Sequence, residues 1–259
     1  MSAAWDPGQY GRFADERERP FHDLLNAVPP ADVRRAVDLG CGTGNLTRLL
    51  AERWPKAQVL GLDNSPEMLE KSRENALPGR LKFERGEIAE WAPFAPYDLI
   101  VSNAALHWVP DHPTLITGLA RRVGPGGIVA VQMPGNHTAP SHREIITLAL
   151  TPRWEPLLGD LARGPIHVRD LADYIAWLRP LGFQVSAWET TYLQQLRGPN
   201  AVLEWIKGTF LRPYFARLDD GAREEFESEA AIRLAAAYPS EADVTLFPFR
   251  RLFFVAQRG

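Results

Sequence analysis

The fold is decided by the stretch Val37-Asp38-Leu39-Gly40-Cys41-Gly42-Thr43-Gly44-Asn45. This glycine-rich turn joins an apolar run, residues 33–39, to a segment with helical patterning, residues 46–54. Glycine lets the backbone come close to a ligand, because a Cβ at Gly40 or Gly42 would intrude on the ligand and restrict φ. A tight turn between strand and helix with no ligand is the alternative, and the acidic residues that follow argue against it.

Short apolar runs alternate with longer helix-patterned segments from residue 33 onward, which is typical of a doubly wound parallel sheet. The strands predicted in this part are residues 33–39, 58–63, 81–84, 97–102 and 126–133. One intervening helix is marked at both ends, by Asn64 or Ser65 as N-cap with Pro66 behind it, and by Pro78-Gly79 as the stop. The pattern predicts five strand–helix units in succession.

The regular alternation stops after Pro134, and two further strands are predicted at residues 183–193 and 251–257. We therefore predict an α/β fold with a doubly wound, mostly parallel seven-stranded sheet. The predicted organisation is a core at 1–133 with an N-terminal helical segment, a helical insertion at 134–165, a core continuation at 166–197, a helical cap at 198–248 and a last core strand at 249–259. We expect the insertions to cap the carboxyl edge of the sheet, where open α/β sheets bind their ligands.

The composition is that of an ordinary folded enzyme, with 259 residues of which 45% are hydrophobic and 24% charged. The single cysteine, Cys41, excludes an intramolecular disulfide and a cysteine metal cage, and we expect no metal. A net charge of −3 gives no electrostatic reason to bind nucleic acid. The sequence has no signal-peptide pattern and no run of about eighteen apolar residues. We therefore expect a cytoplasmic protein with neither a membrane nor a nucleic-acid partner.

A carboxylate at the end of the second predicted strand indicates a nucleoside cofactor. Asp63 follows Gly44 by nineteen positions, where it can accept hydrogen bonds from both ribose hydroxyls. The dinucleotide pattern G-x-G-x-x-G fails, because its last position falls on Asn45 when counted from Gly40 and on Thr47 when counted from Gly42. The pattern of a P-loop is also absent.

What remains is D-x-G-x-G-x-G at residues 38–44, then Asp63, then Gly86-Glu87, and this set resembles the class I S-adenosylmethionine-dependent methyltransferases. The resemblance implies a Rossmann-like fold, S-adenosyl-L-methionine as cofactor and S-adenosyl-L-homocysteine as product. Glu87 stands where the family commonly has an aspartate that contacts the adenine amino group; a solvated surface glutamate is the alternative. The cofactor-binding residues that the resemblance implies are Gly40, Cys41, Gly42, Asp63, Asn64, Met68, Glu87, Ile88 and Asn103.

The substrate class depends on what the nucleophile needs. A carbon acid or a phenol needs a base to remove its proton before it attacks. A carboxylic acid with a pKa of about 4 is already ionised at neutral pH and can attack directly. Cationic side chains that fix carboxylates are then expected, and the candidates are Lys207, Arg212 and the pair Arg250-Arg251. Each of these can instead be a solvated surface cation. His107 can donate to an anionic substrate, act as a base, or be structural.

A narrower resemblance extends over nearly the whole chain, to the trans-aconitate 2-methyltransferases. Nine segments carry it: Trp5-Asp6-Pro7 with Tyr10, Phe13, Glu16-Arg17 and Arg19-Pro20; Arg53-Trp54-Pro55; Ser65-Pro66-Glu67-Met68; Val109-Pro110-Asp111-His112; Ala130-Val131-Gln132-Met133-Pro134 with Asn136; Thr190-Thr191-Tyr192; Glu204-Trp205; Leu211-Arg212-Pro213; and Arg251-Leu252-Phe253. That family transfers a methyl group to a carboxylate of trans-aconitate and releases the monomethyl ester.

The resemblance implies a small tricarboxylate as the partner and no residue required as a general base. The implied substrate-binding residues are Tyr10, His107, Trp108, Gln132, Tyr192, Lys207, Arg212 and Arg251. His107-Trp108 departs from the glutamine-tryptophan pair associated with relatives, which puts a catalytic role of His107 in doubt. Two alternatives stay open: a class I methyltransferase for another small carboxylate or a malonyl-carrier substrate, and a non-enzymatic S-adenosylmethionine-binding module.

Overall fold

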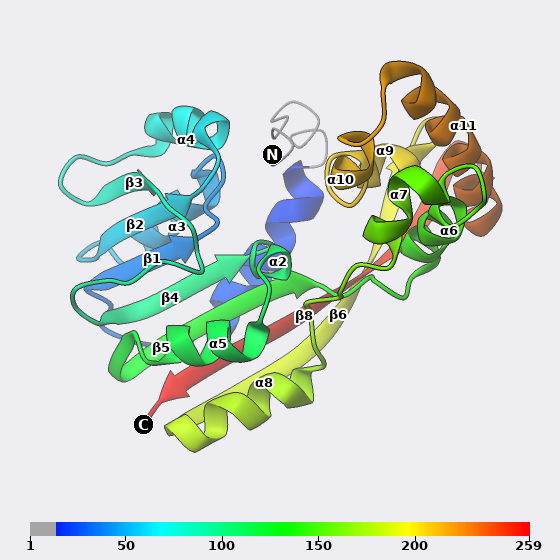
Figure 1. The fold of residues 1–259 in the computed structure, drawn as a ribbon. Coiled ribbons are helices and arrows are strands. Elements are labelled where there is room, and N and C mark those ends of the chain that lie inside the picture. The colour runs from blue at the N-terminus through cyan, green and yellow to red at the C-terminus, as the bar shows by residue number, and fades with distance from the viewer. Residues whose placement is uncertain (1–13) are drawn as a thin grey trace. The chain divides into compact units, whose positions relative to one another are not determined.

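The structure, a computed structural model, describes residues 14–259 (Figure 1). Its strands are β1 (Arg35–Leu39), β2 (Gln58–Asp63), β3 (Leu81–Arg85), β4 (Tyr97–Asn103), β5 (Val123–Pro134), β6 (Phe183–Arg197), β7 (Ser240–Glu241) and β8 (Val244–Arg258). Its α-helices are α2 (Ala14–Ala27), α3 (Asn45–Arg53), α4 (Pro66–Ser72), α5 (His112–Ala120), α6 (Pro140–Ala149), α7 (Glu155–Ala162), α8 (Leu171–Leu178), α9 (Ala201–Lys207), α10 (Arg212–Phe215) and α11 (Asp220–Ala237). Short 3₁₀ turns are η1 (Arg73–Asn75), η2 (Leu106–Trp108) and η3 (Arg179–Leu181).

The sheet has the order β3-β2-β1-β4-β5-β8-β6, and β7 pairs with β8 outside this path. The pairs β1–β2, β1–β4, β2–β3 and β4–β5 are parallel, and β5–β8 is antiparallel. The predicted seven-stranded, mostly parallel, doubly wound sheet is therefore confirmed. In such an order the chain reverses its direction of winding at β1 and β4, so the loops after these strands face each other at the carboxyl edge.

The last strand begins earlier than predicted. β8 starts at Val244 and its burial alternates up to Phe249, so this part is a strand with one covered face. Pro248 interrupts the apolar run in the sequence, and proline is confined to particular positions in sheets, which is why the sequence predicted a later start.

The chain separates into two compact units. The sheet unit consists of 15–134, 167–190 and 251–259. In Figure 1, α5 and α8 lie in front of its sheet, and α2 and α3 lie behind it. Its core joins the sheet to α5 and α8 through fully buried side chains such as Ile100, Val129, Ile116, Tyr174 and Phe254.

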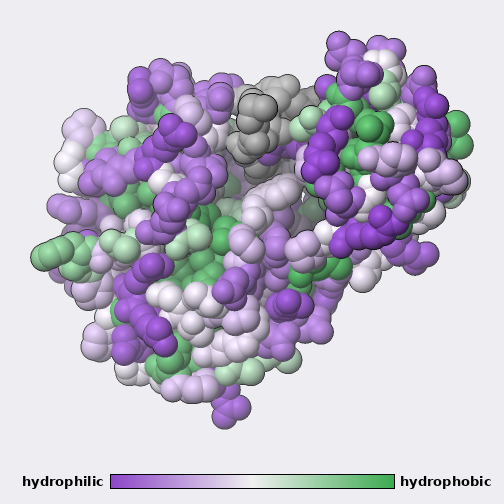
Figure 2. All heavy atoms as spheres, viewed as in Figure 1, coloured by the Kyte–Doolittle hydropathy of each residue, from purple (hydrophilic) through white to green (hydrophobic). Residues whose placement is uncertain are grey.

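The helical unit includes residues 135–166 and 191–250, and it has a core of its own. Trp154, Trp205, Phe226 and Phe247 are buried at its centre, with the rings of Trp154 and Phe226 edge to face at 5.2 Å. The face of the molecule seen in Figure 2 is mostly hydrophilic, with hydrophobic residues interspersed. Among residues 14–259, no helix combines the length and the apolar character needed to cross a membrane.

A buried histidine fixes the segment that follows β4. His112 Nε2 lies 3.0 Å from the carbonyl oxygen of Leu106, and its Nδ1 lies 2.6 Å from the hydroxyl of Tyr174. Burial lowers the pKa of His112, so the ring is neutral. Because a carbonyl only accepts, Nε2 carries the proton and Nδ1 accepts from Tyr174, whose oxygen in turn accepts from the backbone N–H of Arg169.

We expect Tyr174→Phe to lower the free energy of unfolding by about 1–3 kcal/mol, because it leaves the buried Nδ1 of His112 without a donor and removes the acceptor of the Arg169 backbone N–H. Urea unfolding of the variant measures this. The control is Tyr97→Phe, which removes a hydroxyl from another buried tyrosine of the same unit. Equal stability of the two variants would contradict the role given to the Tyr174 hydroxyl.

Candidate active site

Two of the three glycines in the loop between β1 and α3, Gly40 and Gly42, differ in what surrounds them. Gly40 has φ +81°, and a Cβ there would come within 2.2 Å of the Cβ of Ala105, in the loop after β4. The loop after β4 therefore leaves no room for a Cβ at Gly40, while contact of Gly40 with a ligand stays a prediction. Gly42 has φ +55°, and a Cβ there would meet no protein atom within 4 Å. Gly42 therefore leaves room for a ligand against the loop.

Asp63, at the end of β2, joins two loops through its carboxylate. Oδ2 accepts the backbone N–H of Gly42 at 2.8 Å, and Oδ1 accepts that of Ser65, the N-cap of α4, at 2.9 Å. A carboxylate offers about four lone-pair sites, so acceptor capacity remains on both oxygens. The half-buried Asp63 is thus placed to accept from two further hydroxyls, as a ribose requires.

The residues after β2 and β3 come together beside Asp63. Asn64 Nδ2 lies 3.2 Å from each carboxylate oxygen of Glu87, and both residues are exposed. Met68 is buried on α4 and Ile88 is half-buried. The structure therefore brings Asn64 and Glu87 together, while contact of these two residues, Met68 and Ile88 with the cofactor stays a prediction.

Asp38, inside β1, is a polar residue of this region that the set of predicted binding residues missed. It is buried and accepts a hydrogen bond of 2.7 Å from the hydroxyl of Thr47 on α3. Burial, together with the nearby charge of Asp63, raises the pKa of Asp38 to about 7, although the hydrogen bond from Thr47 opposes the shift. Its place as the first residue of the D-x-G-x-G-x-G pattern was the signal that could have found it. Burial also raises the pKa of the Cys41 thiol, so this thiol is protonated at neutral pH.

The carboxyl ends of β4 and β5 hold a second group of predicted site residues. Asn103 and Gln132 are register partners on these strands, and the N–H of Ala104 donates to the Gln132 carbonyl at 2.9 Å. Ala104 has φ +54°, a strained value for a residue other than glycine. Arg251, at the start of the part of β8 that pairs with β5, donates from Nη1 to Gln132 Oε1 at 3.2 Å. Asn103, Gln132 and Arg251 therefore meet at one edge of the sheet.

His107 and Trp108 lie in η2, close after β4, with ring centroids 4.7 Å apart. His107 is half-buried and Trp108 is 42% exposed, so the indole can contact a ligand. Among residues 14–259, no group of three or more His, Cys, Asp or Glu side chains is placed to hold a metal ion.

The other predicted substrate residues belong to the helical unit, except Tyr10, which lies outside the described residues. Tyr192 is buried and Arg212 is half-buried at the start of α10. The ammonium of Lys207 contacts the carboxylate of Glu204 at 2.6 Å and also that of Glu227. Its charge is therefore balanced within its own unit. The roles of these residues stay predictions.

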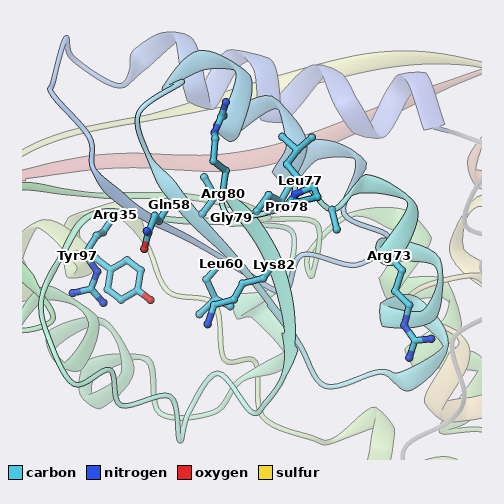
Figure 3. A pocket seen from close by; sticks show the side chains of 13 residues that line it. Arg35, Gln58, Leu60, Arg73, Leu77, Pro78, Gly79, Arg80, Lys82 and Tyr97 are labelled. Atoms are coloured by element: carbon cyan, nitrogen blue, oxygen red, sulfur yellow. The ribbon is translucent and has the colours of Figure 1, made fainter.

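A pocket at the opposite edge of the sheet carries none of the predicted binding residues (Figure 3). Arg35, Gln58, Leu81 and Tyr97, which begin the first four strands of the sheet, are among its lining residues. It therefore lies at the amino ends of the strands, whereas sheets of this kind bind ligands at the carboxyl ends. In Figure 3, the cationic side chains of Arg35, Arg73 and Arg80 lie on different sides of the pocket, so they do not converge on one point.

Comparisons with known proteins agree with this geometry. A family described as a methyltransferase domain matches residues 36–127, which contain the loops after β1, β2, β3 and β4. The chain is 49% identical to trans-aconitate 2-methyltransferase of Streptomyces avermitilis, over 98% of this chain and 97% of that one. It is 47% identical to the protein of the same name from Mycolicibacterium gilvum, over 98% of each. The chain belongs to the trans-aconitate 2-methyltransferase family.

Solved structures agree on the fold. A Bacillus subtilis protein, YcgJ, superposes with a TM-score of 0.61 at 15% identity, over 93% of this chain and 98% of that one. Phosphoethanolamine N-methyltransferase 2 of Haemonchus contortus, solved with S-adenosyl-L-methionine, gives 0.54 at 19% identity, over 93% and 52%. As a member of the trans-aconitate 2-methyltransferase family, the protein is an S-adenosylmethionine-dependent methyltransferase, so the predicted family and cofactor are confirmed.

We expect Asp63→Ala to lower the affinity for S-adenosylmethionine at least about tenfold, because each hydrogen bond to a charged acceptor is worth roughly 1.5–3 kcal/mol. Calorimetric titration measures the affinity. Asp98→Ala is the matched control, since Asp98 also accepts two backbone N–H groups, of Arg34 and Arg35, but at the amino end of the sheet. If both variants bind the cofactor as the unchanged protein does, the nucleoside does not lie at Asp63.

The raised pKa of Asp38 predicts a pH-dependent stability. Between about pH 4, where the unfolded carboxyl ionises, and about pH 7, the folded state holds a proton that the unfolded state has lost. The free energy of unfolding, relative to Asp38→Asn, should therefore fall by up to about 4 kcal/mol as the pH rises through this window, and level off above it. Urea unfolding of both proteins across the window tests this, and a difference that is constant or rises with pH would refute it.

Proposed function

We propose that the protein transfers the methyl group of S-adenosylmethionine to a carboxylate of trans-aconitate, giving the monomethyl ester and S-adenosylhomocysteine. The observation that carries this proposal is 49% identity to a curated relative of that name over 98% of this chain and 97% of the relative. Since the two chains match nearly end to end, the proposal does not depend on a domain that only one of them has.

The chemistry needs no proton transfer. Bound S-adenosylmethionine supplies a methyl group on a positively charged sulfur. A substrate carboxylate with an ordinary pKa near about 4 is ionised at neutral pH, so its oxygen can attack without a base. One C–O bond forms, the S–C bond breaks, and the electron pair remains on sulfur. The protein's task is to place the carboxylate in line, which can lower the barrier by roughly 7–11 kcal/mol.

The site for this reaction is proposed at the carboxyl edge of the sheet unit. The cofactor would lie against Gly42, with its ribose on Asp63, and the substrate would lie toward Gln132 and Arg251. Three observations support this arrangement: the open side of Gly42, the remaining acceptor capacity of Asp63, and the buried cation of Arg251. For Lys207, the contacts with two carboxylates of its own unit favour a structural role over a substrate clamp.

A panel of carboxylic acids tests the proposed function. Methyl transfer from labelled S-adenosylmethionine is measured for tricarboxylates, dicarboxylates and a malonyl-carrier substrate. We expect trans-aconitate to give the highest kcat/KM. A higher kcat/KM for a dicarboxylate or the malonyl carrier would favour the alternative hypothesis, a class I methyltransferase that acts on another carboxylate. Cofactor binding without transfer to any acid would favour a non-enzymatic binding module.

We expect His107→Gln to keep kcat for trans-aconitate within about tenfold, since loss of a general base usually costs about 10²–10⁴-fold. Steady-state kinetics at saturating cofactor measure kcat, and urea unfolding verifies that the variant is folded. A loss of about 10³-fold or more in a folded variant would mean that His107 acts as a base, and would contradict methyl transfer without proton transfer.

A further inference from the structure

We propose that the side-chain amide of Gln132 donates a hydrogen bond to the substrate carboxylate that becomes methylated, and that Arg251 is a positioning residue that acts through Gln132. This inference rests on the proposed function and assigns the group that holds its nucleophile. Neither residue is part of the cofactor cradle formed by the loops after β1, β2 and β3.

The three side chains at the β4–β5–β8 edge lie on one face of the sheet. Gln132 is the register partner of Asn103 on β4 and of Phe253 on β8. Register partners share a face, and residues two apart on a strand share a face as well, so Arg251 lies on the same face as Phe253. Gln132 is fully buried and Arg251 is 4% exposed. A cation and an amide are thus held in a desolvated position at the carboxyl edge.

Arg251 fixes which way the Gln132 amide points. A guanidinium has donors only, so the group of Gln132 that faces Nη1 at 3.2 Å must be its carbonyl oxygen, Oε1. The amide nitrogen Nε2 is then turned away from Arg251 and presents its two N–H donors elsewhere. Nε2 is buried, and within residues 14–259 it has no hydrogen-bond partner. A buried donor without an acceptor costs free energy, so an acceptor from a ligand is expected there.

The neighbouring strand, β4, carries a buried acceptor that has no donor within the described residues. The side-chain oxygen Oδ1 of Asn103 is also buried and accepts no hydrogen bond from the described part of the chain. An acceptor at Asn103 suits a ligand that donates, such as an ammonium group, whereas the donor at Gln132 suits a carboxylate. The edge therefore separates a place for a cationic ligand group from a place for an anionic one.

A neutral amide suits the nucleophile better than a direct arginine contact. An arginine fork binds both oxygens of a carboxylate at once and would hold the lone pairs that must attack. One N–H from Gln132 can bind one oxygen and leave the other free to form the C–O bond. Arg251 binds the other end of the Gln132 amide, where its hydrogen bond to Oε1 polarises the amide and strengthens the N–H donor. After transfer, the ester carbonyl oxygen can still accept the same N–H.

The principal test is Gln132→Glu, which keeps the size and the acceptor for Arg251 but replaces the donor by a negative charge. We expect kcat/KM for trans-aconitate to fall at least about 100-fold, since like charges face each other across the site. The affinity for S-adenosylmethionine should stay within about threefold of the unchanged value. Gln257→Glu is the matched control, because Gln257 is a glutamine of β8 at the amino end of β5, opposite Ile128, and this change should leave kcat/KM within about twofold.

The role of Arg251 is tested by a double-mutant cycle with Gln132→Met, which removes the donor without adding charge. We expect Arg251→Met to lower kcat about tenfold in the unchanged protein and less than about twofold in the Gln132→Met background. Arg251→Lys, which keeps a donor toward Oε1, should recover most of kcat. Equal losses from Arg251→Met in both backgrounds would mean that Arg251 acts on the substrate directly, and would overturn its role as a positioning residue.

The outcomes separate this inference from the proposed function. All variants are assayed with the acid that the unchanged protein methylates best. If Gln132→Glu keeps its kcat/KM within about threefold on that acid, the assignment of Gln132 is overturned while methyl transfer to a carboxylate stands. If the unchanged protein methylates no carboxylic acid, the proposed function fails, and this inference fails with it.

Discussion

The carboxylate of Asp63 is the constraint on which the proposed cofactor site depends. By accepting the N–H groups of Gly42 and Ser65, it holds the loop after β1 against the start of α4. A buried hydrogen bond from Thr47 to Asp38 joins the two elements on either side of the same loop, β1 and α3. A site assembled in this way is formed by backbone groups and two acidic residues, so it can tolerate wide variation in the surrounding side chains. That tolerance fits a fold shared with solved structures at 15–19% identity.

The order of the strands decides what lies beside the cofactor site. The parallel strands β4 and β5 bring Asn103 and Gln132 to the carboxyl edge as register partners. The antiparallel strand β8 enters its pairing with β5 at this same edge, where Arg251 pairs with Pro134. An antiparallel last strand thus delivers a buried cation to the place where an anionic substrate would meet the methyl group. In a wholly parallel sheet this position would belong to the end of a strand and its following loop.

The sequence predicted the parallel part of the sheet and the class I methyltransferase pattern because their signals are local. Glycine spacing, the acid at the end of the second strand and the strand–helix alternation all lie within residues 33–133, and each was found there. What the sequence missed depends on contacts between distant residues. Ala105 leaves no room for a Cβ at Gly40, Glu227 forms an ion pair with Lys207, and Arg251 orients the amide of Gln132. No spacing rule joins these pairs. The roles of Tyr192 and Arg212 stay predictions from the resemblance.

The central claim is that an ionised carboxylate attacks the methyl group with no proton transfer. Methylation of a phenol or a carbon acid releases one proton per turnover, whereas methylation of a carboxylate releases none. The most direct measurement follows proton release with an indicator dye in weak buffer while S-adenosylhomocysteine formation is recorded in parallel. The assay is run at about pH 8, where carboxylic acids are ionised. With trans-aconitate as substrate we predict no proton released for each S-adenosylhomocysteine formed. A ratio of one proton to one product would contradict the account.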